Sequence, residues 1–331
     1  MDYKIIAIKI NEIQDISDVI KKIWDYLFKN KSGDIVVIKP NYGHTELFPA
    51  VVTNPVVLLE TVKILRDKFN RVIIGESNLP RYNIYQVLKN TPLLKAIKKV
   101  GGEFINFSDD KWVETKGKFS RFKFPLPKTL MDADFKVNIP VIKTHELTYF
   151  TCSIKNLFGC IPRNDRIVYH RRIHEILMDL YDAIKPDFTL ADGTICMDGN
   201  GPIHGNLREE GILIGGTDSL AVDKFICDLI NFDLENIPHI NNLWKLRAGK
   251  IDVKIVGNVP KALSFIPKKL DIQAKVMINT FKSPQLSKLL YFTPIFSILE
   301  KLTWGIREIL GIHKINEKVE IKSLKYWQEI G

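Results

Sequence analysis

Residues 34–77 contain "DIVVIKP" (34–40), then a polar loop, then "NPVVLLETVKILRDKF" (54–69) and "RVIIGES" (71–77). The first and last segments are short runs of β-branched residues, which is typical of buried strands. The middle segment has apolar residues at helical spacing. Asn54 can cap this helix, and Pro55 suits its first position. Strand, helix and strand in this order predict an α/β protein.

The same alternation continues along most of the chain. We expect helices at 82–102, broken near Pro92, and at 175–185 and 219–232. We expect further strands at the N-terminus and at 103–107, 134–143, 187–193 and 251–259. The pattern predicts a largely parallel sheet with helices on both faces.

One internal similarity raises a further hypothesis about the architecture. "IVVIKPNYGHT" (35–45) and "IPVIKTHELT" (139–148) each run from an apolar strand into a polar loop with histidine and threonine. Two similar half-units around a cleft would explain this, and chance similarity between strand ends is the alternative. No short-period repeat is present.

The positive charge of the chain is concentrated near its C-terminus. The net charge is +10, and residues 245–331 hold 16 Lys and Arg against 7 Asp and Glu. We therefore expect an α/β body at 1–260 and a basic extension at 261–331. Within the extension, 286–314 predicts a basic amphipathic helix. Its longest uncharged run has 11 residues, whereas a bilayer-spanning helix needs about 20. The helix could lie on a membrane surface or pack on the body or on a partner protein.

Cysteine content and short motifs exclude several classes of protein. The four cysteines, Cys152, Cys160, Cys196 and Cys227, form no C-x-x-C pair, so we expect no iron–sulfur cluster and no disulfide scaffold. With no signal-peptide pattern at the N-terminus, this predicts a cytoplasmic protein. We find no nucleic-acid-binding signature, and therefore expect no nucleic-acid partner. No phosphate-binding loop or nucleophile elbow is found either.

Polar side chains follow several of the expected strands. They are Lys39, Asn41, Glu76, Lys143, His145 and Asp192. Ligands of parallel α/β sheets bind outside the carboxyl ends of the strands, so these side chains are candidates for one site. Lys39 and Lys143 could each hold a small anion as a point charge. The alternative is that both are surface lysines with extended stems.

Lys155 is the candidate for a reactive lysine. It lies among Ile154, Leu157 and Phe158, and burial there would depress its pKa. We expect His145, Lys155 and His170 to act in proton transfer or cofactor binding, and Asn41 and Asn156 to orient the substrate. An ion pair between Lys155 and Glu146 would instead make the lysine structural.

Two carboxylates lie on glycine-rich turns in "LADGTICMDGNGP" (190–202). Asp192 and Asp198 could hold Mg²⁺ or bind a ligand hydroxyl. Aspartate and glycine also dominate plain turns, which is the competing interpretation.

Several segments together resemble the domain of unknown function 362 family, from about residue 34 to 235. They include "VVIKPN", "VIIGES", "IPVIKTHELTYFTCSIKNLFGCIP", "YHRRIHE", "DFTLADG" and "LAVDKFICDLINF". Some members of that family carry a ferredoxin-like cysteine run, which this chain lacks.

The order of His145, Lys155 and His170 is also similar, more distantly, to that in nickel-pincer lactate racemases. In that family a histidine precedes the lysine that carries the pincer cofactor, and a nickel-ligating histidine follows. The resemblance implies a shared scaffold and a nickel-type cofactor. Two departures argue against covalent attachment. Ser153 and Ile154 replace a glycine pair, and Lys39-Pro40-Asn41 replaces an arginine-bearing motif.

Three functional hypotheses follow from these residues. The first is an enzyme that acts on a small anionic molecule by proton or hydride transfer, as a racemase or epimerase does. The second is a metal-dependent phosphoryl or nucleotide enzyme that uses Asp192 and Asp198. The third is a cofactor carrier or maturation factor, without turnover, that docks on a membrane or a partner protein.

Overall fold

The computed structural model describes residues 2–45, 47–79, 81–247, 249–267, 279–280, 283, 285–286, 289 and 325–331. The α-helices are α1 (Asp15–Phe28), α2 (Pro55–Arg66), α3 (Ile84–Leu88), α4 (Leu93–Lys99), α5 (Lys128–Met131), α6 (Ser153–Asn156), α7 (Ile173–Ile184), α8 (Ser219–Leu229) and α9 (Pro238–Arg247). Short 3-10 helices are η1 (Phe107–Asp109), η2 (Leu157–Cys160), η3 (Arg166–Arg172) and η4 (Leu234–Asn236).

The large sheet is mostly parallel, as predicted. Its main path runs β13 (Lys250–Val256), β1 (Asp2–Lys9), β12 (Ile212–Gly216), β10 (Phe188–Asp198), β7 (Phe135–Asn138), β2 (Gly33–Lys39), β3 (Phe69–Glu76) and β4 (Glu103–Asn106). Along this path β12 is antiparallel to both neighbours, and every other adjacent pair is parallel. The carboxyl ends of β2, β3 and β7 therefore meet at one edge of the sheet, where the candidate site lies.

Three short strands extend the sheet beside β10, and a separate hairpin lies outside it. The extra strands are β8 (Val141–His145), β9 (Tyr149–Thr151) and β11 (Asn206–Arg208). The hairpin pairs β5 (Trp112–Lys116) with β6 (Lys123–Pro127). Sequence periodicity predicted neither β8–β9 nor this hairpin as separate units.

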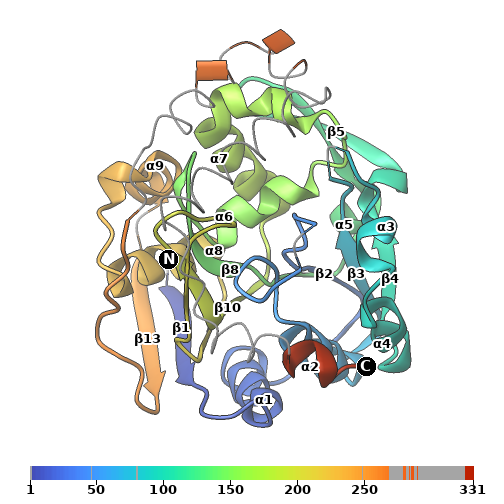
Figure 1. Cartoon of the computed structure of the whole chain (residues 1–331), viewed down its shortest axis with the longest axis vertical. Coiled ribbons are helices and arrows are strands. Elements are labelled where there is room, and N and C mark those ends of the chain that lie inside the picture. Colours follow the sequence, from blue (N-terminus) through green and yellow to red (C-terminus); the bar gives the residue numbers. More distant parts are fainter. Residues whose placement is uncertain are drawn as a thin grey trace, which may run out of the picture.

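Helices cover both faces of the sheet, which confirms the prediction. Buried side chains of α1, α2 and α4 pack on one face, and those of α7, α8 and α9 pack on the other. Neighbouring strand residues alternate between the two cores, because successive side chains of a strand point to opposite faces. In β1, Ile5 joins one core and Ile6 the other. Figure 1 shows α1 and α2 at the bottom of the molecule and α7 at the top.

The predicted strand at 134–143 is interrupted in the structure. β7 ends at Asn138 and β8 begins at Val141. Pro140 lies between them and has no N–H for a ladder hydrogen bond. Its carbonyl still accepts a hydrogen bond from Asp192 N at 2.8 Å. This break separates β8 from β7, and β8 pairs with β10.

The described parts of the C-terminal extension pack on the body. Leu263 N donates to Leu229 O at 2.6 Å, and Trp327 Nε1 donates to Leu47 O at 2.8 Å. Figure 1 shows the last residues beside α2. Apart from Leu286 and Leu289, the helix predicted at 286–314 lies outside the described residues. Within the described ranges, none of the helices has the length and apolarity that crossing a bilayer requires.

The cap of α2 gives a direct test of how this fold is held together. Asn54 is fully buried, its Oδ1 accepts from Val56 N at 3.0 Å, and its Nδ2 donates to Thr194 Oγ1 at 3.1 Å. We expect Asn54→Ala to lower the free energy of unfolding by about 2 kcal/mol, because both bonds are lost. Urea denaturation measures this.

The matched control is Asn83→Ala at the start of α3. Asn83 makes the same cap bond, to Tyr85 N at 2.9 Å, from a less buried position. Asn83→Ala should lower the free energy of unfolding by only about 0.5–1 kcal/mol. Equal losses in the two variants would show that the link from Asn54 to Thr194 contributes nothing.

Candidate active site

Lys39 and Glu76 form a buried ion pair at the ends of neighbouring strands. Lys39 Nζ lies 2.8 Å from Glu76 Oε2, and the side chains are 3% and 1% exposed. Lys39 Nζ also donates to Pro40 O at 2.6 Å. Lys39 was predicted to hold an external anion; the structure instead gives its charge an internal partner.

The Glu76 carboxylate also holds the loop that follows β2. Its Oε2 accepts from Tyr42 N at 2.9 Å, and its Oε1 accepts from Ser77 N at 3.0 Å. Gly159 of η2 lies directly against the pair, since a Cβ there would fall 2.9 Å from Lys39 Nζ. The ion pair thus ties β2, β3, the loop and η2 together.

Lys143 reaches the same loop from β8. Its Nζ donates to Val51 O at 2.6 Å. Burial, together with the nearby Lys155 charge, lowers the pKa of Lys143 to about 7. The lysine therefore loses or gains its charge close to neutral pH.

Lys155 is positioned by a cap from a distant helix. Asp223 of α8 accepts hydrogen bonds from Ser153 N at 2.7 Å and Ile154 N at 2.9 Å, which fixes the first turn of α6. The Lys155 ammonium lies 5.0 Å from the centroid of the Phe158 ring. This confirms the predicted contact between the lysine and its apolar neighbour.

The charge of Lys155 has no acidic partner in the described part of the chain. Its Nζ makes no hydrogen bond or ion pair there, so the predicted alternative of a pair with Glu146 is not formed. Burial and the charges of Arg166 and Lys39 lower the pKa of Lys155 to about 8, although Glu146 acts in the opposite direction.

Two neutral imidazoles accompany Lys155. His145 Nδ1 accepts from Leu147 N at 3.0 Å, which leaves its proton on Nε2. Burial and the neighbouring Lys155, Lys143 and His170 hold the pKa of His145 well below its ordinary value. His170 Nδ1 lies 3.1 Å from Ile167 O, and burial lowers the pKa of His170 to about 3. The structure therefore brings together His145, Lys155 and His170.

The two candidate asparagines hold the backbone of the site. Asn156 Nδ2 donates to Asn138 Oδ1 at 2.8 Å, and Asn138 Nδ2 donates to Ser153 O at 2.8 Å. Asn41 N donates to Thr53 Oγ1 at 2.7 Å. These contacts fix α6 and the loop after β2, and the predicted role in orienting a substrate stays a prediction.

Asp192 and Asp198 have structural partners. Asp192 accepts from Asn54 N at 2.8 Å and from Thr194 N and Oγ1 at 3.0 and 2.6 Å. Asp198 accepts from Asn206 Nδ2 at 2.8 Å, Arg208 Nη1 at 3.3 Å and Ile266 N at 3.0 Å. These bonds use both oxygens of each carboxylate.

Sequence reasoning missed several groups at the site. Arg166 is buried, and its Nη1 donates to Ile161 O at 3.2 Å. His239 is also buried, and its Nδ1 lies 3.1 Å from His174 Nδ1. The Tyr42 hydroxyl is buried and has no hydrogen-bond partner among the described residues. None of these follows directly from the sequence pattern, although Arg166 lies four residues before His170.

The described donor residues do not form a metal site. Across the described ranges, no group of three or more His, Cys, Asp or Glu side chains is placed to hold a metal ion. Lys155 and the two imidazoles are present, but a third ligand for nickel or Mg²⁺ is missing from that part of the structure. We therefore derive no chemical step through a metal or a nickel-type cofactor.

Comparison with known proteins places the chain in a family. The model of the family described as Domain of unknown function (DUF362) matches residues 36–228. The chain belongs to this family. A relative named thylakoid-associated protein, from Synechocystis sp., is 30% identical over 218 residues. The match covers 63% of this chain and 66% of the relative, just under two thirds of its length.

Two solved structures show a weaker likeness. The lactate racemase apoprotein from Thermoanaerobacterium thermosaccharolyticum matches with a TM-score of 0.44 and 16% identity, over 67% of this chain and 56% of that one. A protein from Thermotoga maritima matches with a TM-score of 0.39 and 13% identity, over 66% and 58%. At these values neither likeness supports an argument about function.

The buried ion pair yields a prediction about stability. Glu76→Gln leaves the Lys39 charge buried without its partner, and we expect it to lower the free energy of unfolding by about 3–5 kcal/mol. Chemical denaturation at pH 7 checks this.

Glu103→Gln is the matched control, because Arg71 and Glu103 join β3 to β4 as an exposed pair at 2.8 Å. That variant should cost less than about 1 kcal/mol. Comparable losses from the two substitutions would contradict the assigned role of the Lys39–Glu76 pair.

Proposed function

We propose that this protein is an enzyme that binds a small anionic molecule beside Lys155 and transfers a proton through that lysine. Lys143 and the Nε2–H of His145 contribute to anion binding. The proposal rests on the residues of this chain alone.

The observation that carries the proposal is a surplus of positive charge on three buried side chains, Lys39, Lys143 and Arg166, and on the half-buried Lys155. Lys155 lies close to three further cationic side chains: the charges of Arg166 and Lys39 lower its pKa, and its own charge lowers the pKa of Lys143. Within the described residues, Lys39 is the one of these four that forms a salt bridge. Unpaired buried charge is costly. Glu76 neutralises one of these cations, and a bound anion would neutralise part of the remaining positive charge.

The pKa of Lys155 suits it to proton transfer. A general acid or base works best when its pKa lies near the operating pH. With a pKa of about 8, Lys155 has both its neutral and its protonated form accessible near neutral pH. The same environment that gives Lys155 no ion-pair partner among the described residues therefore supplies a reactive amine.

The two imidazoles can act as polar neutral groups around that amine. Because His145 keeps its proton on Nε2, it can donate a hydrogen bond to an anion without carrying charge. His170 has its lone pair on Nε2 when Nδ1–H donates to the Ile167 carbonyl. A substrate proton can then move between Lys155 and a carbon or oxygen acid held by these groups.

A carrier without turnover is the second candidate, because the same charge surplus would hold a carried anion. Exchange of substrate hydrogen with solvent distinguishes the two. The full-length protein is incubated in D₂O with small carboxylates that bear an acidic C–H, and NMR follows deuterium incorporation. Exchange that is lost in Lys155→Met supports an enzyme. Tight anion binding without exchange supports a carrier.

Anion affinity should fall as the pH rises through 7 and 8. Lys143 is protonated below its pKa of about 7 and Lys155 below its pKa of about 8, so the site loses two positive charges across this interval. Isothermal titration calorimetry with a small carboxylate ligand, repeated from pH 6 to pH 9, measures this change in affinity. Lys155→Met should weaken binding at pH 6 and flatten the pH profile, and an unchanged profile would contradict the assignment.

The same lysine should destabilise the free protein. The folded-state pKa of Lys155 is lowered from 10.5 to about 8. The unfolded chain therefore binds more protons between these values, and stability rises with pH in that window. Without ligand at pH 7, Lys155→Met should raise the free energy of unfolding by about 1–3 kcal/mol.

The exposed residue Lys98 on α4 gives the control variant Lys98→Met, which should leave stability within about 0.5 kcal/mol. A destabilised Lys155→Met protein would indicate that the ammonium has a favourable partner in the folded state.

A further inference from the structure

A pocket lies at the edge of the sheet opposite the candidate active site. Its volume is about 530 Å³. It is formed at the amino ends of β1, β7 and β10 and after the end of the antiparallel strand β12. The lining residues are Tyr3, Phe28, Lys31, Phe135, Tyr181, Lys185, Pro186, Asp187, Thr217, Asp218 and Arg247. Lys39 and Glu76 end their strands at the other edge, so this pocket is separate from the candidate active site.

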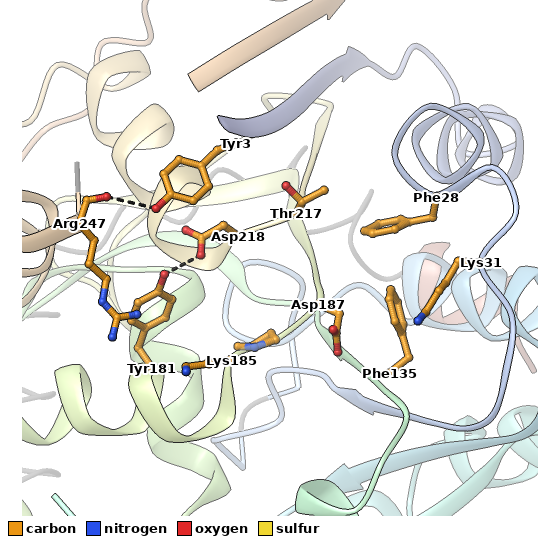
Figure 2. A pocket seen from close by; sticks show the side chains of 11 residues that line it. Tyr3, Phe28, Lys31, Phe135, Tyr181, Lys185, Asp187, Thr217, Asp218 and Arg247 are labelled. Carbon is orange, nitrogen blue, oxygen red and sulfur yellow. Dashed lines mark hydrogen bonds between the residues drawn. The ribbon is translucent and has the colours of Figure 1, made fainter. Parts of the chain in front are cut away.

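The acidic side chains of the pocket wall are used by the protein itself. Asp187 Oδ2 accepts from Lys136 N at 2.8 Å. Asp218 caps α8 by accepting from Ala221 N at 2.9 Å, and it accepts from the Tyr181 hydroxyl at 2.5 Å. Figure 2 shows this last bond at the wall opposite Phe28 and Phe135.

Two lysines of the wall are not used in this way. Their backbone N–H groups donate to Phe28 O and Tyr181 O, but neither Lys31 Nζ nor Lys185 Nζ makes an ion pair or hydrogen bond with any residue that the structure describes. Lys31 lies 5.4 Å from the centroid of the Phe135 ring. The pocket therefore presents two ammonium groups beside aromatic rings, while both oxygens of Asp218 and Oδ2 of Asp187 already accept hydrogen bonds.

The backbone at Lys185 has the left-handed conformation that ends many helices. Lys185 ends α7 with φ 45° and ψ 71°, in the left-handed region. Glycine adopts this conformation at helix ends without strain, whereas a residue with a Cβ is disfavoured there. Strain of this kind is often retained at ligand sites.

We infer that this pocket binds a small anion that carries a planar ring. Its phosphate or carboxylate group interacts with Lys31 and Lys185, and its ring packs against the half-buried side chain of Phe28, which Phe135 supports from the core. The two rings lie together with Lys31 on one side of the opening in Figure 2, with Asp187 between them and Tyr181. The inference does not depend on the function proposed for the other edge.

Calorimetry with phenyl phosphate and the full-length chain at pH 7 tests the inference. Inorganic phosphate supplies the charge alone and benzyl alcohol the ring alone, and both should bind more weakly than phenyl phosphate. Lys31→Gln and Lys185→Gly should each weaken phenyl phosphate binding by about fivefold. Lys98→Gln, an exposed charge on α4, should leave it unchanged.

Further variants separate loss of binding from loss of folding. Lys185→Gly removes the strained Cβ and should not lower Tm, so weaker binding in this variant cannot come from unfolding. Lys155→Met should leave the affinity unaltered, because Lys155 lies at the other site.

Three results would overturn the inference. The first is no detectable binding of phenyl phosphate up to about 10 mM, which corresponds to a binding free energy weaker than about 3 kcal/mol. The second is equal affinity for phenyl phosphate and inorganic phosphate. The third is binding that is lost in Lys155→Met but retained in Lys31→Gln and Lys185→Gly.

Discussion

The buried ion pair between Lys39 and Glu76 holds the candidate site together. It joins the ends of β2 and β3, and through Tyr42 N it fixes the loop to which Lys143 donates. Gly159 lets η2 lie against the pair, so Lys155 on the preceding helix is brought near the Lys39 charge. The ion pair therefore does more than neutralise two buried charges. It also fixes the positions of Lys143 and Lys155, the cations without an ion-pair partner among the described residues.

The remaining cations influence each other's protonation. Lys143 and Lys155 both have a lowered pKa. Beside burial, the charge of Lys155 lowers the pKa of Lys143, and the charges of Arg166 and Lys39 lower the pKa of Lys155. An anion that binds between such groups favours their protonated forms, and by linkage protonation favours the anion. Binding and proton transfer would therefore be coupled at this site, and the energy stored as buried like charge is released when the anion arrives.

The sequence predicted the α/β class, the parallel strands and the cap at Asn54 because local periodicity and capping determine them. It also predicted that Lys155 would lie against Phe158, since the apolar neighbours are adjacent in sequence. It could not show that Lys39 would be neutralised by Glu76, because that contact joins residues 37 positions apart through strand order. The hydrogen bond from Asn54 N to Asp192 spans 138 positions and was equally inaccessible.

The groups that were missed share a physical reason. Arg166 and His239 are not at strand ends, and their burial arises from how η3 and α9 pack against neighbouring helices. The pocket at the amino edge was missed because the sequence argument considers only polar residues at the carboxyl ends of the strands. Its wall combines residues from β1 to α9, which no local pattern connects.

The most direct measurement is the pKa of Lys155 itself. Protein labelled with ¹³C at the lysine ε-carbon is titrated by NMR, with Lys155→Met to assign the signal. The account predicts a pKa of about 8 in the free protein, rising when a small carboxylate binds. A pKa near 10.5 without ligand would show that the ammonium is solvated or paired with an acid, and would contradict the account.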